Sequence, residues 1–185
     1  MFYPTLLAFA VLNSPAAEAQ SALEDGFAGA LRGCEEWVLN PSSWIDGVAP
    51  FVSVVGLGNQ MSLVAQVDAA SLPPVPLRRA NHYWRINSTE TAGYVLIVSD
   101  ELPMCHITGG GSLDLQPYVE AVLASEEFEA RWEAAERSET GDIKSTTYRN
   151  RRNPSLTAVI SRANAPGARL DRVQVLVTGT YAVSD

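Results

Sequence analysis

The sequence has few of the residues, and none of the motifs, that identify a chemistry. Its 185 residues include two cysteines, two histidines and one lysine. Without a Gly-x-Ser-x-Gly motif, a serine hydrolase would need an unfamiliar arrangement of scattered serines. The histidines lack a spacing such as His-x-x-x-His, and no glycine-rich motif is followed by Lys-Ser or Lys-Thr as in a phosphate loop. The sequence therefore predicts no metal site and no cofactor.

What is present is the composition of an ordinary globular protein. Hydrophobic residues make up 46% of the chain and charged residues 18%. Mean hydropathy is +0.01, and this balance argues against a disordered, collagenous or coiled-coil chain. The length suits one domain with one core, and no linker, internal repeat or change of composition marks a second domain.

The first nineteen residues predict a secretory signal peptide. An apolar run over residues 5–12 is followed by a break over residues 13–15 and by Ala17-Glu18-Ala19. The small side chains of this last segment suit cleavage before residue 20. The run is too short for a permanent membrane-spanning helix. We expect a single mature domain over residues 20–185, periplasmic or secreted and without a transmembrane segment; an uncleaved anchor or a buried N-terminal strand is the alternative.

The two cysteines, Cys34 and Cys105, are expected to form a disulfide, because an exported chain enters an oxidising compartment. They lie 105 − 34 = 71 positions apart. Closing so long a loop removes on the order of 4 kcal/mol of entropy from the unfolded chain.

The hydrophobic pattern predicts an α+β fold. Helical spacing of apolar residues indicates a first helix from Ser21 to about Asn40-Pro41. We expect a helical region over residues 112–135, divided into two helices, and loops over residues 72–77 and 109–111. Strands are predicted over residues 61–67, 82–87, 94–98, 104–108, 143–149, 156–161 and 173–183. Together they predict a single antiparallel sheet with the helices packed on one face.

The candidate catalytic residues are His106, His82 and Asp100. If their side chains met in space, they could form a general base or a minimal set of ligands for a metal ion. Cys105 and His106 are neighbours in a predicted strand, so their side chains point to opposite faces. A disulfide at Cys105 would also remove the thiolate that nucleophilic catalysis requires. The simpler interpretation is a polar histidine on a sheet face or edge.

Charge is distributed unevenly along the chain. Residues 113–142 contain nine acidic and two basic residues, whereas residues 143–172 contain seven basic and one acidic. Arg149, Arg151 and Arg152 cluster at a predicted hairpin tip, where guanidinium groups could bind a phosphate or carboxylate of an envelope component. The alternative is that this basic hairpin forms ion pairs with the acidic helices. The net charge of −8, together with export, argues against nucleic acid as a partner.

The order of these features resembles that of small exported proteins of Gram-negative bacteria that have no assigned activity. The shared features are a signal peptide, a short helix with Gly-Cys-Glu-Glu-Trp, a strand ending Pro-Met-Cys-His, a glycine-rich link, a Phe/Trp helix and a β-rich C-terminus. Twelve arginines against one lysine are compatible with a GC-rich source. The resemblance covers most of the mature chain and implies a periplasmic location and a structural pairing of Cys34 with Cys105. It carries no active-site residue.

These observations lead us to expect a non-enzymatic exported protein that binds an anionic envelope component or a partner protein. One alternative is a small hydrolase or metal-dependent enzyme that uses His82, His106 and Asp100. Another is an inhibitor or immunity-like protein that blocks a secreted enzyme through the loop of residues 72–79.

Overall fold

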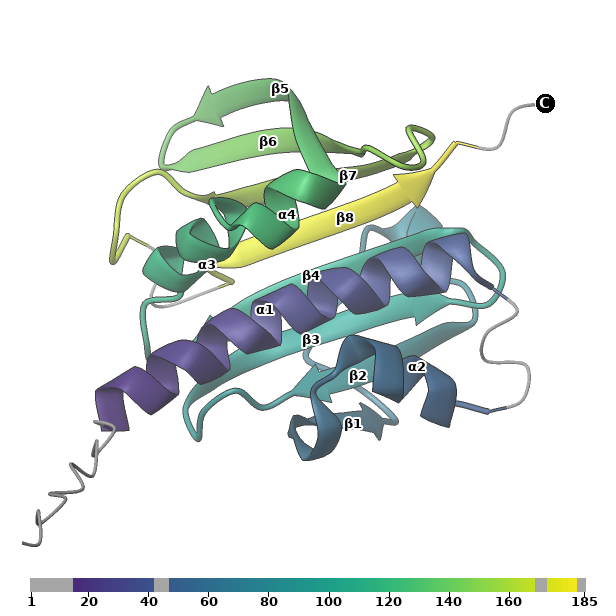
Figure 1. Ribbon diagram of the computed structural model, residues 1–185, viewed down its shortest axis with the longest axis horizontal. Coiled ribbons are helices and arrows are strands. Elements are labelled where there is room, and N and C mark those ends of the chain that lie inside the picture. Colours follow the sequence, from purple (N-terminus) through teal and green to yellow (C-terminus); the bar gives the residue numbers. More distant parts are fainter. Residues whose placement is uncertain (1–14, 42–46, 169–172, 183–185) are drawn as a thin grey trace, which may run out of the picture.

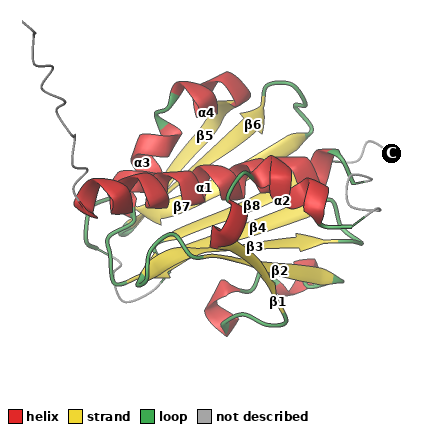
Figure 2. Ribbon diagram, turned by 60° about the horizontal axis from the view of Figure 1, so that its bottom comes forward, coloured by secondary structure: helices red, strands yellow, loops and turns green. Residues whose placement is uncertain are grey.

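The computed structural model describes residues 15–41, 47–168 and 173–182, and within them one antiparallel sheet carries four helices on one face (Figures 1 and 2). This is the predicted α+β architecture. The helices are α1 (Pro15–Leu39), α2 (Ala49–Val55), α3 (Gln116–Leu123) and α4 (Glu126–Arg131). The strands are β1 (Met61–Val64), β2 (Asn81–Ile86), β3 (Ala92–Ser99), β4 (Met104–Gly111), β5 (Trp132–Thr140), β6 (Ile143–Asn150), β7 (Leu156–Ala163) and β8 (Val175–Tyr181).

The sheet consists of two four-strand meanders joined at their last strands. Its order is β1-β2-β3-β4-β8-β7-β6-β5, with every neighbouring pair antiparallel. Each meander follows a pair of helices along the chain, α1 and α2 in the first half and α3 and α4 in the second. The two halves of the fold therefore share one topology, although the sequence contains no internal repeat.

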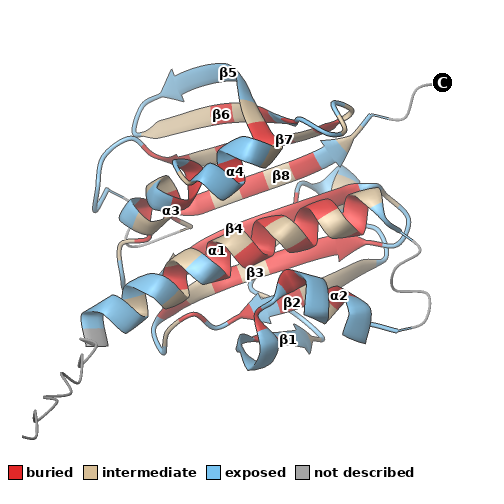
Figure 3. Cartoon of the chain, viewed as in Figure 1, coloured by how far each residue is buried: buried red, intermediate tan, exposed pale blue. Residues whose placement is uncertain are grey.

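Helix α1 lies along the middle of the sheet, and the most deeply buried residues lie between them (Figure 3). Its inner face packs on β3 and β4 through apolar side chains such as Leu23 and Phe27. Glycines bring the helix close to the sheet, since a Cβ added at Gly33 would lie 2.8 Å from the Leu96 side chain. The predicted disulfide is confirmed: Cys34 of α1 is bonded to Cys105 of β4.

The predicted strands over residues 82–87 and 94–98 are paired as β2 and β3, and those over residues 143–149 and 156–161 are paired as β6 and β7. The first helix ends at Leu39, close to its predicted end, but it begins at Pro15 and so passes through the expected cleavage site. The predicted apolar run over residues 5–12 lies outside the described residues. No helix in the described part of the chain has the length and hydropathy needed to cross a membrane.

The predicted helical region over residues 112–135 is wrong at its C-terminal end. Helix α4 ends at Arg131 and the chain continues as β5, which pairs with β6 along its length. Helix-forming alanines and glutamates lie in this strand because the β6 edge supplies its backbone partners, and such long-range pairing overrides local propensity. A β-bulge between Ala134 and Glu136 and a run of exposed side chains protect this edge of the sheet.

Three further boundaries differ from the prediction. Residues 109–111 are the end of β4 and pair with β3, where we predicted a loop. Gly109 is required there because a Cβ would lie 2.7 Å from the Tyr94 ring. Residues 65–67 do not continue β1, which ends at Val64. The predicted loop over residues 72–77 contains a short 3-10 helix, Val75–Leu77.

Candidate functional site

The sheet has a helix face and an open face, and the disulfide identifies them. Cys105 points toward α1, so its neighbour His106 points to the open face. Residues 65–80, which we call the crossing segment, connect β1 to β2. Its end is tied to β3, where Ser99 Oγ donates a hydrogen bond to the Arg79 carbonyl oxygen at 2.6 Å. Its beginning lies beside open-face residues of β3 and β4, with which it lines a groove.

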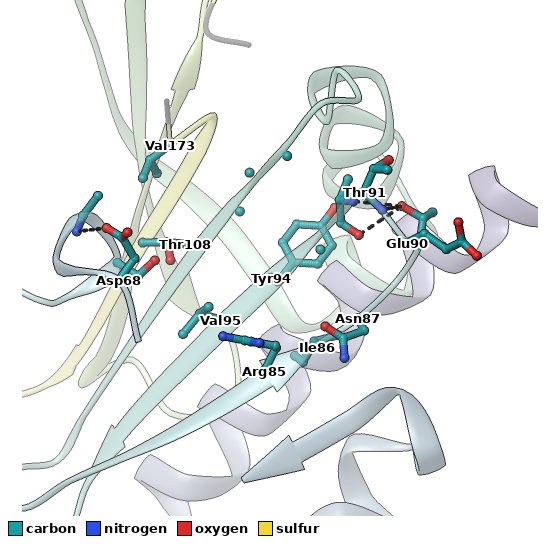
Figure 4. Close-up of a pocket in the computed structure, with 18 residues that line it drawn as sticks. Asp68, Arg85, Ile86, Asn87, Glu90, Thr91, Tyr94, Val95, Thr108 and Val173 are labelled. Carbon is teal, nitrogen blue, oxygen red and sulfur yellow. Dashed lines mark hydrogen bonds between the residues drawn. The ribbon is translucent and has the colours of Figure 1, made fainter. Parts of the chain in front are cut away.

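This groove has a volume of about 660 Å³ and lies at one end of β2, β3 and β4 (Figure 4). The volume falls within the range of about 300–1,000 Å³ that is usual for small-molecule sites. Asp68 and Ser71 of the crossing segment form one wall, and the turn between β2 and β3 forms another. The open-face side chains Val95 and Thr108 lie between them.

The groove exists because a pair of glycines leaves the sheet bare. Gly93 of β3 is in register with Gly110 of β4, and this pair lies next to the registered pair Val95 and Thr108. Gly93 cannot be replaced without a clash, because a Cβ would collide with the Ile86 carbonyl oxygen. The close approach of β2 and β3 therefore requires glycine at this position, and the missing side chain leaves the groove open.

The adjoining turn is fixed by hydrogen bonds. Thr89 Oγ1 accepts a hydrogen bond from the Ala92 backbone N–H at 3.0 Å, and the Thr89 N–H donates to the Ala92 carbonyl oxygen at 2.9 Å. The groove is consequently formed by strands and a closed turn, and such a frame needs little reorganisation to receive a ligand.

Among the described residues that line the groove, one is an arginine, Arg85, and it is exposed. Its register neighbours, Ser62 on β1 and Val95 on β3, are uncharged. Its guanidinium has no hydrogen-bond or ion-pair partner among the described residues. Figure 4 shows it directed over Val95. A guanidinium without a partner presents a donor fork that matches a carboxylate or a phosphate.

Two acidic residues, Asp68 and Glu90, also line the groove. Asp68 Oδ1 accepts a hydrogen bond from the Ala70 N–H at 2.8 Å, which fixes the carboxylate at the start of a short 3-10 turn. In Figure 4 Asp68 lies on the side of Thr108, whereas the Glu90 carboxylate is turned away from both. The groove thus presents charges of both signs.

The structure brings together two of the three candidate catalytic residues. His82 Nε2 lies 2.7 Å from Asp100 Oδ2, and the His82 ring lies 5.5 Å from the Trp37 ring on the helix face. His106 is on the opposite face, 1% exposed, with Nδ1 3.0 Å from Thr178 Oγ1 and with Nε2 buried and lacking a partner. Burial lowers the pKa of His106 to about 4, so this imidazole is neutral near pH 7.

The described residues contain no group of three or more histidines, cysteines, aspartates or glutamates positioned to hold a metal ion. The sheet separates His106 from the pair formed by His82 and Asp100. A site made from all three is therefore not assembled.

The three predicted binding arginines differ in their surroundings. Arg151 donates to Glu133 Oε2 at 3.3 Å and to the Glu129 carbonyl oxygen at 2.8 Å. Arg149 and Arg152 are exposed, and their guanidinium groups have no partner in the part of the chain that the structure describes. Two of the three thus remain available for an anion.

Other basic residues of this region do form ion pairs with the acidic helices. Arg162, 7% exposed, and Lys144 reach Glu120 Oε1 at 2.6 and 2.8 Å. Burial alone would raise the pKa of Glu120, but hydrogen bonds from Arg162 and Lys144 outweigh it and lower that pKa. These two cations stabilise the contact between α3 and the second meander.

The loop predicted for an inhibitor, residues 72–79, is partly anchored. Pro73 is buried, and Arg78 Nε donates to the Pro73 carbonyl oxygen at 2.7 Å. Val75 is 72% exposed and forms its apolar tip.

Sequence reasoning missed the groove and its residues. One signal was available: Arg85 alternates with His82, Trp84 and Ile86, which places it on the face opposite the core. The facing of Gly93 and Gly110 was not visible, because it depends on strand register. A comparison of the chain with protein-family models, with curated proteins and with solved structures found no match.

Proposed function

We propose that this chain is an exported binding protein without a reaction of its own, which holds a component of the cell envelope or a partner protein at the groove beside Arg85. The observation that carries the proposal is the combination of a groove of about 660 Å³ with a guanidinium that has no partner among the described residues. The expected signal peptide, the disulfide and the resemblance to exported Gram-negative proteins support export.

Arg85 suits the role of an anchor for physical reasons. Its backbone is held on both sides, since β2 pairs with both β1 and β3. A ligand anion would replace water around the guanidinium without first breaking an internal ion pair. Placement on a paired strand means that the backbone needs no further ordering on binding.

The test is capture from an envelope extract by the immobilised protein as it is recovered from the exported fraction. We compare wild type with Arg85→Glu and with the double variant Arg149→Glu/Arg152→Glu. All three substituted arginines are exposed and have no side-chain partner among the described residues, so the double variant is a matched control.

Reversal of Arg85 is expected to abolish capture, and the double variant is expected to retain it. Loss of capture in the double variant alone would overturn the groove assignment in favour of the predicted arginine cluster. Unchanged capture in both variants would refute the proposed function.

Export is tested separately by the mass of the protein recovered after expression in a Gram-negative host. Cleavage after Ala19 gives a chain that begins at Gln20 and whose mass falls further by two hydrogen atoms for the disulfide. Recovery of the uncleaved chain from the cytoplasm would refute export.

A second candidate function, a small hydrolase, is favoured by the 2.7 Å contact between His82 and Asp100. A carboxylate hydrogen-bonded to a histidine orients it as a general base. A screen of ester, amide and phosphate substrates with wild type, His82→Ala and Asp100→Asn decides the question. Turnover that both substitutions remove would establish hydrolysis and overturn the non-enzymatic proposal.

A further inference from the structure

We propose that the ligand of the groove is a zwitterion, a free amino acid or a short peptide, whose carboxylate pairs with Arg85 and whose ammonium group pairs with Asp68. This inference rests on the proposed function, because it identifies the ligand of the same groove.

The two charged groups are available for one ligand at the same time. Both line the groove, yet they form no ion pair with each other. Asp68 Oδ1 is engaged by the Ala70 N–H, whereas Oδ2 has no hydrogen bond within the described ranges. A ligand that carries opposite charges at its two ends would satisfy both without displacing an existing contact.

The balance of charge favours a zwitterion over a polyanion. Arg85 is the sole basic side chain among the described residues that line the groove, whereas Asp68 and Glu90 are acidic. A second negative group on a ligand would find no cation and would meet carboxylates, and like charges at short range are repelled. An ammonium group beside Asp68 removes this penalty.

The bare floor suits the main chain of a peptide. The registered glycines Gly93 and Gly110 carry no side chain, so a flat backbone can lie against the sheet there. Each peptide residue spans at most about 3.3–3.6 Å. The distance between the two charged ends of the ligand therefore increases in steps, and the best-bound member of a series of increasing length reports the span between Arg85 and Asp68.

The experiment is titration calorimetry of the oxidised protein from the exported fraction with alanine, dialanine and trialanine, and with the N-acetyl and C-amide forms of the best-bound member. The variants are Arg85→Gln and Asp68→Asn, with Arg149→Gln as control. Asparagine retains the side-chain oxygen that accepts the Ala70 N–H, so the turn is preserved in the second variant.

We expect C-terminal amidation to weaken binding to wild type by about tenfold or more, as for loss of a charge-assisted hydrogen bond. The same amidation should have no effect on binding to Arg85→Gln. N-acetylation should likewise weaken binding to wild type and have no effect on Asp68→Asn. The control should bind like wild type.

Absence of binding across the series would overturn the inference, and so would amidation that weakens wild type and Arg85→Gln equally. The proposed function is judged independently by envelope capture. If Arg85→Glu abolishes capture while no zwitterion binds, the proposed function stands and this ligand class is refuted. If Arg85→Glu leaves capture unchanged and no zwitterion binds, both proposals fail.

Discussion

Removing the disulfide should lower the free energy of unfolding by about 4 kcal/mol. The bond joins residues separated by 71 positions, and the chain-entropy relation for a loop of this length gives about 4 kcal/mol at 25 °C. That is a large part of the 5–15 kcal/mol that is typical of a domain. Equilibrium unfolding in urea, followed by tryptophan fluorescence, compares wild type with the double variant Cys34→Ala/Cys105→Ala. A difference below about 1 kcal/mol would refute this use of loop entropy.

A cycle with Gly179 tests whether the disulfide sits where the structure places it. A Cβ at Gly179 of β8 would lie 2.5 Å from Cys105 Sγ and 2.9 Å from Cys34 Sγ, whereas its next neighbour, the Thr157 carbonyl oxygen, is 3.8 Å away. Gly179→Ala should therefore cost about 1–3 kcal/mol in wild type, as overpacking of a core does. In the double alanine variant both sulfurs are gone, and the same substitution should cost less than about 0.5 kcal/mol, which leaves a coupling of about 0.5–3 kcal/mol.

The matched control for this cycle is Gly109→Ala. A Cβ there would meet Val175 at 2.6 Å and the Tyr94 ring at 2.7 Å, and neither contact involves sulfur. Its cost should be the same with and without the disulfide. Equal costs of Gly179→Ala in the two backgrounds would contradict the packing described here.

Two further predictions concern buried charge. The pKa of His106 falls from 6.5 to about 4 on folding, so between these pH values the unfolded chain binds a proton that the folded chain does not. The free energy of unfolding should therefore fall by about 3 kcal/mol as the pH is lowered from about 6.5 to about 4. Urea titrations at both pH values should show a smaller fall in His106→Gln. Glu120→Gln leaves the buried Arg162 without its carboxylate and should cost about 2 kcal/mol in the same assay. Glu133→Gln, at the exposed pair with Arg151, should cost less than about 0.5 kcal/mol. Equal costs would refute the difference expected between a buried and an exposed ion pair.

The parts of the fold that could be predicted are those in which local pattern and tertiary contact agree. Helix α1 shows helical spacing of buried residues, and β2 alternates between buried and exposed at Trp84, Arg85 and Ile86. Strand β5 could not be predicted, because residues 132–140 contain alanine and glutamate that favour a helix, and its pairing with β6 decides the outcome.

The candidate sites also include features that a local pattern predicts and features that it does not. The contact between His82 and Asp100 follows from the pairing of β2 with β3, whereas the sequence analysis grouped both residues with His106. His106 could be assigned to the face opposite the disulfide by alternation alone. The groove could not be foreseen, because it depends on the register of Gly93 with Gly110 and on the path of the crossing segment, neither of which any local pattern encodes.

The difference between the two halves of the fold explains where a ligand site can arise. Strands β5 and β6 are joined by a tight turn at Gly141, whose φ of +61° is the left-handed conformation that favours glycine. The equivalent connection in the first half, from β1 to β2, is the crossing segment over residues 65–80. A two-residue turn is sufficient to join neighbouring antiparallel strands, so the additional length is not needed for the sheet. It supplies Asp68 and Ser71 to the groove. This is the physical reason why the proposed site lies in the first half of the fold, away from the arginine cluster of the second.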